Sequence, residues 1–178
     1  MNIYKLLTRY GYVYSWNGVI GILVIILGAI LLSLFWYKGG KIRKSQAVAI
    51  VLFAAYIALV FVLTVFGRKT GRRKYELRLF WSYAEIYFGN TKMISEVILN
   101  IFMLTPLGVL LPIIRNKKVF LYKGLIMGFV ISLTIELLQL ATCTGLFELD
   151  DILHNSLGCM LGCMIGVKLQ SLLNISRV

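Results

Sequence analysis

Residues 45–67 read SQAVAIVLFAAYIALVFVLTVFG, a run without one charged side chain. About 20 apolar residues are enough to carry a helix across the hydrocarbon core of a bilayer, so this stretch predicts a transmembrane helix. A second uncharged run precedes it, from Tyr10 to Tyr37. That run is longer than the roughly 7–15 residues of a signal-peptide core, and it ends in Trp36, Tyr37 and Lys38 instead of a small-residue cleavage site. We therefore expect it to be a retained helix.

The rest of the chain continues this pattern. With 60% hydrophobic residues gathered in long runs, the 178 residues predict one all-α, polytopic transmembrane domain, 1–178. We expect five helices, at about 18–37, 45–66, 93–114, 119–141 and 151–173. Pro106 should kink the third helix, because proline donates no backbone hydrogen bond. The basic, aromatic-rich stretch 67–92 is expected to lie on the membrane interface.

The net charge of +12 indicates a membrane surface as partner. The basic residues cluster at the ends of the predicted spans, where lipid head groups and the positive-inside rule account for them, so nucleic acid is not expected. Cys143, Cys159 and Cys163 are odd in number, and the last two lie four apart in an apolar run. This spacing favours neither a disulfide framework nor a zinc site, and we interpret these cysteines as small apolar fillers.

Small residues at intervals of four predict that the last two helices are neighbours. The stripes are Gly124, Gly128 and Ser132 in one helix, and Gly158, Gly162 and Gly166 in the other. Such stripes let membrane helices approach closely. An antiparallel pairing would set Gly124 opposite Gly166 and Gly128 opposite Gly162, with Glu136 close to Asn155.

Polar side chains inside the predicted helices share one depth. Each ionised group near a helix centre costs about 2.5–3.5 kcal/mol on insertion scales, so each needs a partner or a function. In an alternating chain, the start of the third helix, the end of the fourth and the start of the fifth lie on one membrane face, together with the loops 67–92 and 142–150. The residues concerned are Glu96, Asn100, Glu136, Gln139, Asp151 and Asn155.

These residues predict a shallow pocket with carboxylates below and guanidinium groups above. Arginine binds phosphate or carboxylate bidentately, while Glu136, Asp151 and Glu96 are candidate general acids or bases. Glu136 and Asp151 are weak candidates to hold a hard divalent cation such as magnesium; no metal site or cofactor is specified. The predicted ligand-binding set is Arg68, Arg72, Arg73, Arg78, Asn100, Glu136, Gln139, Asp150, Asp151 and Asn155.

A purely structural role for the same residues stays open. The carboxylates could only pair with the arginines and so fix the helix ends, and Asp150 could only be the N-cap of the fifth helix. His154, the one histidine, could bind a metal or carry a proton, or it could be an interfacial residue without such a role.

Several segments in order resemble the VanZ-like family of bacterial membrane proteins, and together they cover about residues 60–167. They are TVFGR at 64–68, ELRLFWSY at 76–83, NIFMLTPLG at 100–108, IELLQ at 135–139 and FELDDILHNSLG at 147–158. In that family an arginine commonly precedes the aspartate-rich motif, where this chain has Gly145 and Leu146, and an aspartate stands where it has Glu148. A mechanism that uses that arginine would need a substitute from the 67–92 loop.

The resemblance implies a multi-pass protein of the bacterial cytoplasmic membrane, related to one associated with resistance to teicoplanin-type glycopeptide antibiotics. We therefore expect a cell-envelope protein whose pocket recognises an anionic lipid or lipid-linked cell-wall precursor. Two alternatives stay open: an intramembrane hydrolase or transferase acting on phosphorylated lipid, and a small proton-coupled transporter using Glu136, for which an inverted repeat is lacking. The positive-inside count is nearly tied, and the densely basic short turns favour an external N-terminus.

Overall fold

The computed structural model describes residues 16–117 and 119–172. Five helices are long and apolar enough to cross a membrane, and they confirm the predicted polytopic all-α fold. They are α2 (Trp16–Lys38), α3 (Lys44–Phe61) with the π-helical extension η1 (Val62–Phe66), α5 (Lys92–Arg115), α6 (Leu121–Thr142) and α7 (Leu149–Leu172). The short helix α4 (Trp81–Tyr87) and the strands β1 (Lys74–Glu76) and β2 (Leu146–Glu148) complete the structure.

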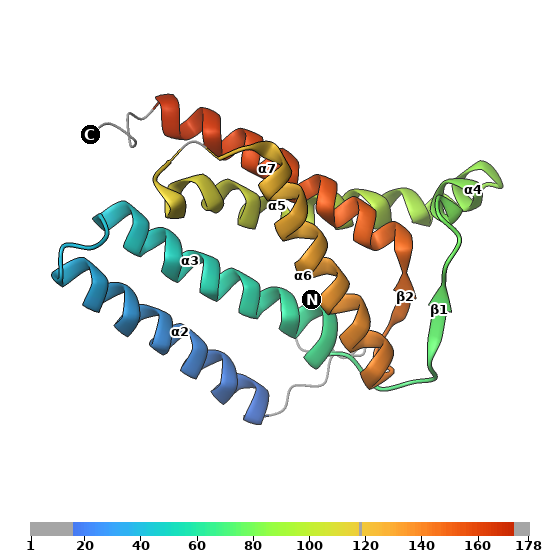
Figure 1. Cartoon of the computed structure of the whole chain (residues 1–178). Helices are drawn as coiled ribbons and strands as arrows, with labels where there is room; N and C mark the ends of the chain where they lie inside the picture. Colours follow the sequence, from blue (N-terminus) through green and yellow to red (C-terminus); the bar gives the residue numbers. More distant parts are fainter. Residues whose placement is uncertain (1–15, 118, 173–178) are drawn as a thin grey trace, which may run out of the picture.

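The helices form two groups that meet at α3 (Figure 1). On one flank α2 packs mainly against α3, and on the other α7 packs closely with α5 and α6. Leu104, Leu107, Ile135 and Cys159 form the centre of the core, together with Val60 and Val65 of the second helix. Pro106 and Pro112 both lie within the continuous helix α5.

α7 runs parallel to α5 and packs against it through its glycines. A Cβ atom added at Gly158 or Gly162 would overlap the carbonyl oxygen of Ile101 or Thr105, and one at Gly166 would overlap that of Val109. The Thr105 hydroxyl also donates to the carbonyl of Gly158 at 3.1 Å. The glycine stripe of α7 therefore lets the backbone of α5 approach.

The predicted register between α6 and α7 is wrong, although the two helices are antiparallel neighbours. Gly124 faces Cys163 and Gly128 faces Cys159, where an added Cβ would lie 2.6 Å from the cysteine Cβ. Successive residues of a helix point about 100° apart, so the cysteines, one position after each glycine, face a different neighbour. Because thiols are small, they fit against the glycines of α6. Cys159 and Cys163 are fully buried and unbridged, as expected of apolar fillers.

We call the membrane face at which α3 and α6 end and α5 and α7 begin the site face. Figure 1 shows α4, β1 and β2 gathered at this end of the helices. The loops 67–92 and 142–150 thus meet there as the alternation of helices predicts, because β1 pairs with β2.

Candidate functional site

The two loops of the site face are joined by backbone hydrogen bonds. β1 and β2 pair in parallel, with Tyr75 opposite Phe147 and Glu76 opposite Glu148. Before this pair, the Gly71 N–H donates to the Cys143 carbonyl at 2.7 Å. The arginine-rich loop is therefore fixed in position over the helix ends.

Asp150 fixes the second half of that loop. Its fully buried carboxylate accepts the backbone N–H groups of Phe80 and Ser82, at 2.6 and 2.9 Å, and the Ser82 hydroxyl at 2.7 Å. It thus caps α4, where free N–H groups favour a negative charge. Asp150 lies inside the first turn of α7, which begins at Leu149, so its interpretation as the N-cap of this helix is wrong.

Glu136 and Asp151 lie together at the centre of the site face. Ser132 and Asn155 are paired, with the Asn155 amide donating to the Ser132 hydroxyl at 2.9 Å. One turn further along this antiparallel register lie Glu136 and Asp151, and the charge of Asp151 acts on Glu136. Glu136 is 2% exposed and accepts the Glu148 N–H at 2.9 Å, so its carboxylate joins α6 to the end of β2.

The other polar residues predicted at this depth differ in the contacts that they make near Glu136 and Asp151. Asn100 donates to the Asp151 carboxylate at 2.5 Å. Asn155 is 1% exposed and its side-chain oxygen has no partner among the described residues. Glu96 is exposed, and its side chain makes no hydrogen bond in the described part of the chain, although its charge acts on Asp151.

Gln139 connects α6 to η1. Its amide donates to the Thr64 carbonyl at 3.0 Å, inside η1. A π-helical turn leaves backbone groups out of the regular helical pattern and is frequent at functional sites. A Cβ on Gly145 would lie 2.5 Å from the Gln139 side-chain oxygen. Glycine at this position therefore leaves room for the Gln139 side chain that binds Thr64.

The four predicted arginines differ in their surroundings. Arg68 follows η1, and its charge acts on both Glu136 and Asp151. Arg72 and Arg73 are exposed on the loop before β1. Arg78 instead binds Glu76 through two side-chain hydrogen bonds of 2.9 and 2.8 Å, which lower the pKa of Glu76 to about 2. Of the four, Arg68 is thus the arginine whose charge acts on these two carboxylates, although its exposed side chain forms no ion pair with either.

Glu148 belongs to the site although the sequence analysis did not select it. It ends β2, and the Trp81 indole donates to its carboxylate at 3.0 Å. Burial, reinforced by the charge of Asp151, raises the pKa of Glu148 to about 8. We call Glu136, Glu148 and Asp151 the acidic cluster. The sequence signal available was the group of acidic residues at 148, 150 and 151, around the start of the last helix.

His154 is buried beneath α4. The Tyr83 hydroxyl lies 3.0 Å from its Nε2, and the two rings meet edge to face. Its Nδ1 has no partner within the described residues, and the side chain is 1% exposed. Over residues 16–117 and 119–172, no three His, Cys, Asp or Glu side chains converge to hold a metal ion.

The family assignment rests on the segments that build this site. The model of the VanZ/LLP1 family matches residues 50–170, from α3 to the end of α7. The chain belongs to the VanZ/LLP1 family. In this VanZ/LLP1 protein the matched part contains η1, both loops and the acidic cluster, whereas α2 lies before it. No curated protein and no solved structure shows significant similarity to the chain.

Proposed function

We propose that this VanZ/LLP1 protein recognises the phosphate-bearing head group of an anionic envelope lipid or lipid-linked cell-wall precursor at the site face, and thereby alters susceptibility to teicoplanin-type glycopeptides. The observation that carries the proposal is Arg68, an exposed guanidinium at the site face directly after η1, whose positive charge acts on Glu136 and Asp151. Guanidinium groups bind phosphate bidentately.

The fixed loop supports this role. Arg72 and Arg73 extend the basic surface beyond Arg68, and the pairing of β1 with β2 holds them over the helix ends. Because the loop is already ordered, a head group would bind without the entropic cost of folding it. We place the site face on the outside of a bacterial cytoplasmic membrane, where the antibiotic acts.

The test uses a strain in which deletion of the gene changes teicoplanin susceptibility. We expect Arg68→Gln, Glu136→Gln and Asp151→Asn to reproduce the deletion at normal membrane abundance. Arg78→Gln is the matched control, since that guanidinium already binds Glu76 and 77% of its side chain is exposed. Wild-type susceptibility in all three site variants would falsify the proposal.

A second candidate function is hydrolysis or group transfer on a phosphorylated lipid. The observation that favours it is the grouping of Glu136, Glu148 and Asp151 at the site face, since carboxylates near one another can serve as a general acid and a general base. Purified protein would be incubated with radiolabelled lipid precursors and several divalent metals. Product formed by the wild type and absent with Glu136→Gln supports catalysis, and no product under any metal counts against it.

A further inference from the structure

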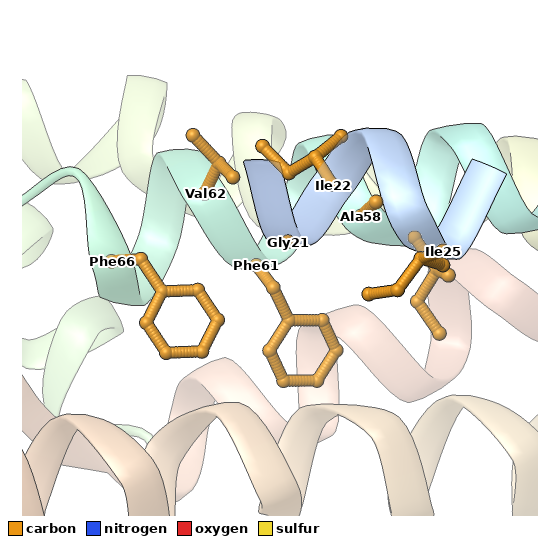
Figure 2. A pocket seen from close by; sticks show the side chains of 8 residues that line it. Gly21, Ile22, Ile25, Ala58, Phe61, Val62 and Phe66 are labelled. Carbon is orange, nitrogen blue, oxygen red and sulfur yellow. The ribbon is translucent and has the colours of Figure 1, made fainter. Parts of the chain in front are cut away.

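A cavity of about 500 Å³ lies between α2 and the end of α3. Figure 2 shows the rings of Phe61 and Phe66 projecting to the same side, beside the α2 backbone at Gly21. The two rings stack with centroids 6.4 Å apart. Among the residues that the structure describes, no ionisable side chain lines the cavity; the lining residues are Gly21, Ile22, Ile25, Ile57, Ala58, Phe61, Val62 and Phe66.

The cavity is in the half of the membrane nearest the site face. Its lining comes from the first turns of α2 and from the last turns of α3 and η1. The antiparallel pair α2 and α3 brings these ends together, and the chain leaves η1 directly into the arginine-rich loop. The cavity and the acidic cluster therefore share one leaflet.

η1 connects the cavity to the candidate site. Phe66 lines the cavity, the Thr64 carbonyl accepts the Gln139 amide, and Arg68 follows two residues after Phe66. Two residues of chain span at most about 7 Å. The backbone of Arg68 therefore lies close to Phe66. A lipid whose phosphate binds at Arg68 would have the first carbons of its acyl chain near the cavity.

We propose that this cavity binds one acyl chain of the anionic lipid whose phosphate contacts Arg68; the proposal rests on the function proposed above. The described lining residues offer no hydrogen-bond partner to a polar ligand. At this depth of the bilayer, lipid acyl chains surround the protein. A chain leaving the bilayer for the cavity gains little hydrophobic free energy. Selective occupancy therefore comes from van der Waals contacts and from the tether to the bound head group.

Two glycines of α2 supply a matched pair of variants. A Cβ added at Gly21 or at Gly28 meets no atom within 4 Å, so both helix positions accept a larger side chain. Gly21 lines the cavity and Gly28 does not. Gly21→Leu should fill the cavity, whereas Gly28→Leu adds the same side chain two turns away on the same helix.

The experiment uses the full chain in phosphatidylcholine nanodiscs with a trace of phosphatidylglycerol carrying a diazirine near the end of one acyl chain. After photolysis, mass spectrometry should place the label on cavity residues. We expect Gly21→Leu to lower this labelling by about threefold, a modest change in affinity, and Gly28→Leu to leave it unchanged. Arg68→Gln should lower it to the level given by a phosphatidylcholine probe with the same chain.

Native mass spectrometry of retained lipid separates the two proposals. If wild type prefers phosphatidylglycerol through Arg68 but Gly21→Leu labels like wild type, the acyl-chain site is wrong and head-group recognition stands. If Arg68→Gln retains phosphatidylglycerol as well as wild type, both fail. Labelling by a polyprenyl phosphate probe alone, or occupation of the cavity by a second copy that crosslinks there, would also overturn the acyl-chain site.

Discussion

Replacing Asp150 by alanine should release α4 and the second half of the arginine-rich loop while the membrane helices stay folded. The carboxylate accepts three hydrogen bonds, from the Phe80 and Ser82 N–H groups and the Ser82 hydroxyl. Hydrogen bonds to a charged group contribute about 1.5–3 kcal/mol each, and neighbouring bonds do not add fully. We therefore expect local opening of the loop to become easier by about 3–6 kcal/mol.

Phe80 makes the effect larger than a simple count of bonds. Its φ of 64° lies in the left-handed region, which is unfavourable for a bulky side chain. Such a conformation persists only where its surroundings enforce it, and here the Asp150 carboxylate binds the Phe80 N–H. Without that acceptor, the turn before α4 loses the contact that holds it.

Amide hydrogen exchange measures this opening directly. An opening free energy lower by 3 kcal/mol corresponds to exchange of the amides at 80–84 about 100-fold faster, since each 1.4 kcal/mol is tenfold. Asp151→Ala is the control, because its carboxylate binds Asn100 on α5 and makes no contact with the loop amides. Unchanged exchange at 80–84 in Asp150→Ala, or equal acceleration in both variants, would refute the capping role.

Three further predictions concern packing, pH and topology. Gly158→Ala should destabilise the protein by about 3 kcal/mol or more, because the added Cβ overlaps a backbone carbonyl. Gly21→Ala is the control and should leave stability unchanged, because its Cβ enters open space. Thermal unfolding in detergent compares the two variants. The raised pKa of Glu148, about 8 against 4.5, means that folding favours the protonated carboxyl. Its contribution to stability is therefore complete below pH 4.5 and is lost as pH rises through 8. Glu148→Gln should flatten this fall in melting temperature with pH, and an unchanged pH profile would contradict the prediction. Reporter fusions should place Asn116 in the cytoplasm and Thr144 outside, and a cytoplasmic Thr144 would remove the antibiotic-facing orientation.

The spans and the shared depth of the polar residues follow from sequence because they depend on length, hydropathy and alternation alone. Uncharged runs fix the helices within a few residues, and alternation then brings Asn100, Glu136 and Asp151 to one face. The rotation of each helix about its own axis could not be predicted in the same way. α7 carries two adjacent small stripes, and no pattern within one helix says which neighbour each of them meets.

The loop contacts could not be predicted for a further physical reason. β1 and β2 have three residues each and α4 has seven, too few to give a periodic signal. Their positions come from side chains far along the chain, such as Asp150 binding the Phe80 N–H. Asp150 and Asp151 are adjacent and chemically alike, yet one caps the loop and the other faces Glu136.

The capping of α4 by Asp150 also determines when the site can form during synthesis. The arginine-rich loop leaves the ribosome before α5 and α6, but its strand partner β2 and its capping carboxylate arrive only with the start of α7. α5 likewise waits for the glycine stripe of α7. Insertion of the last helix is therefore the step that completes the site, and a chain released before α7 would carry every arginine of the loop without a place to hold them.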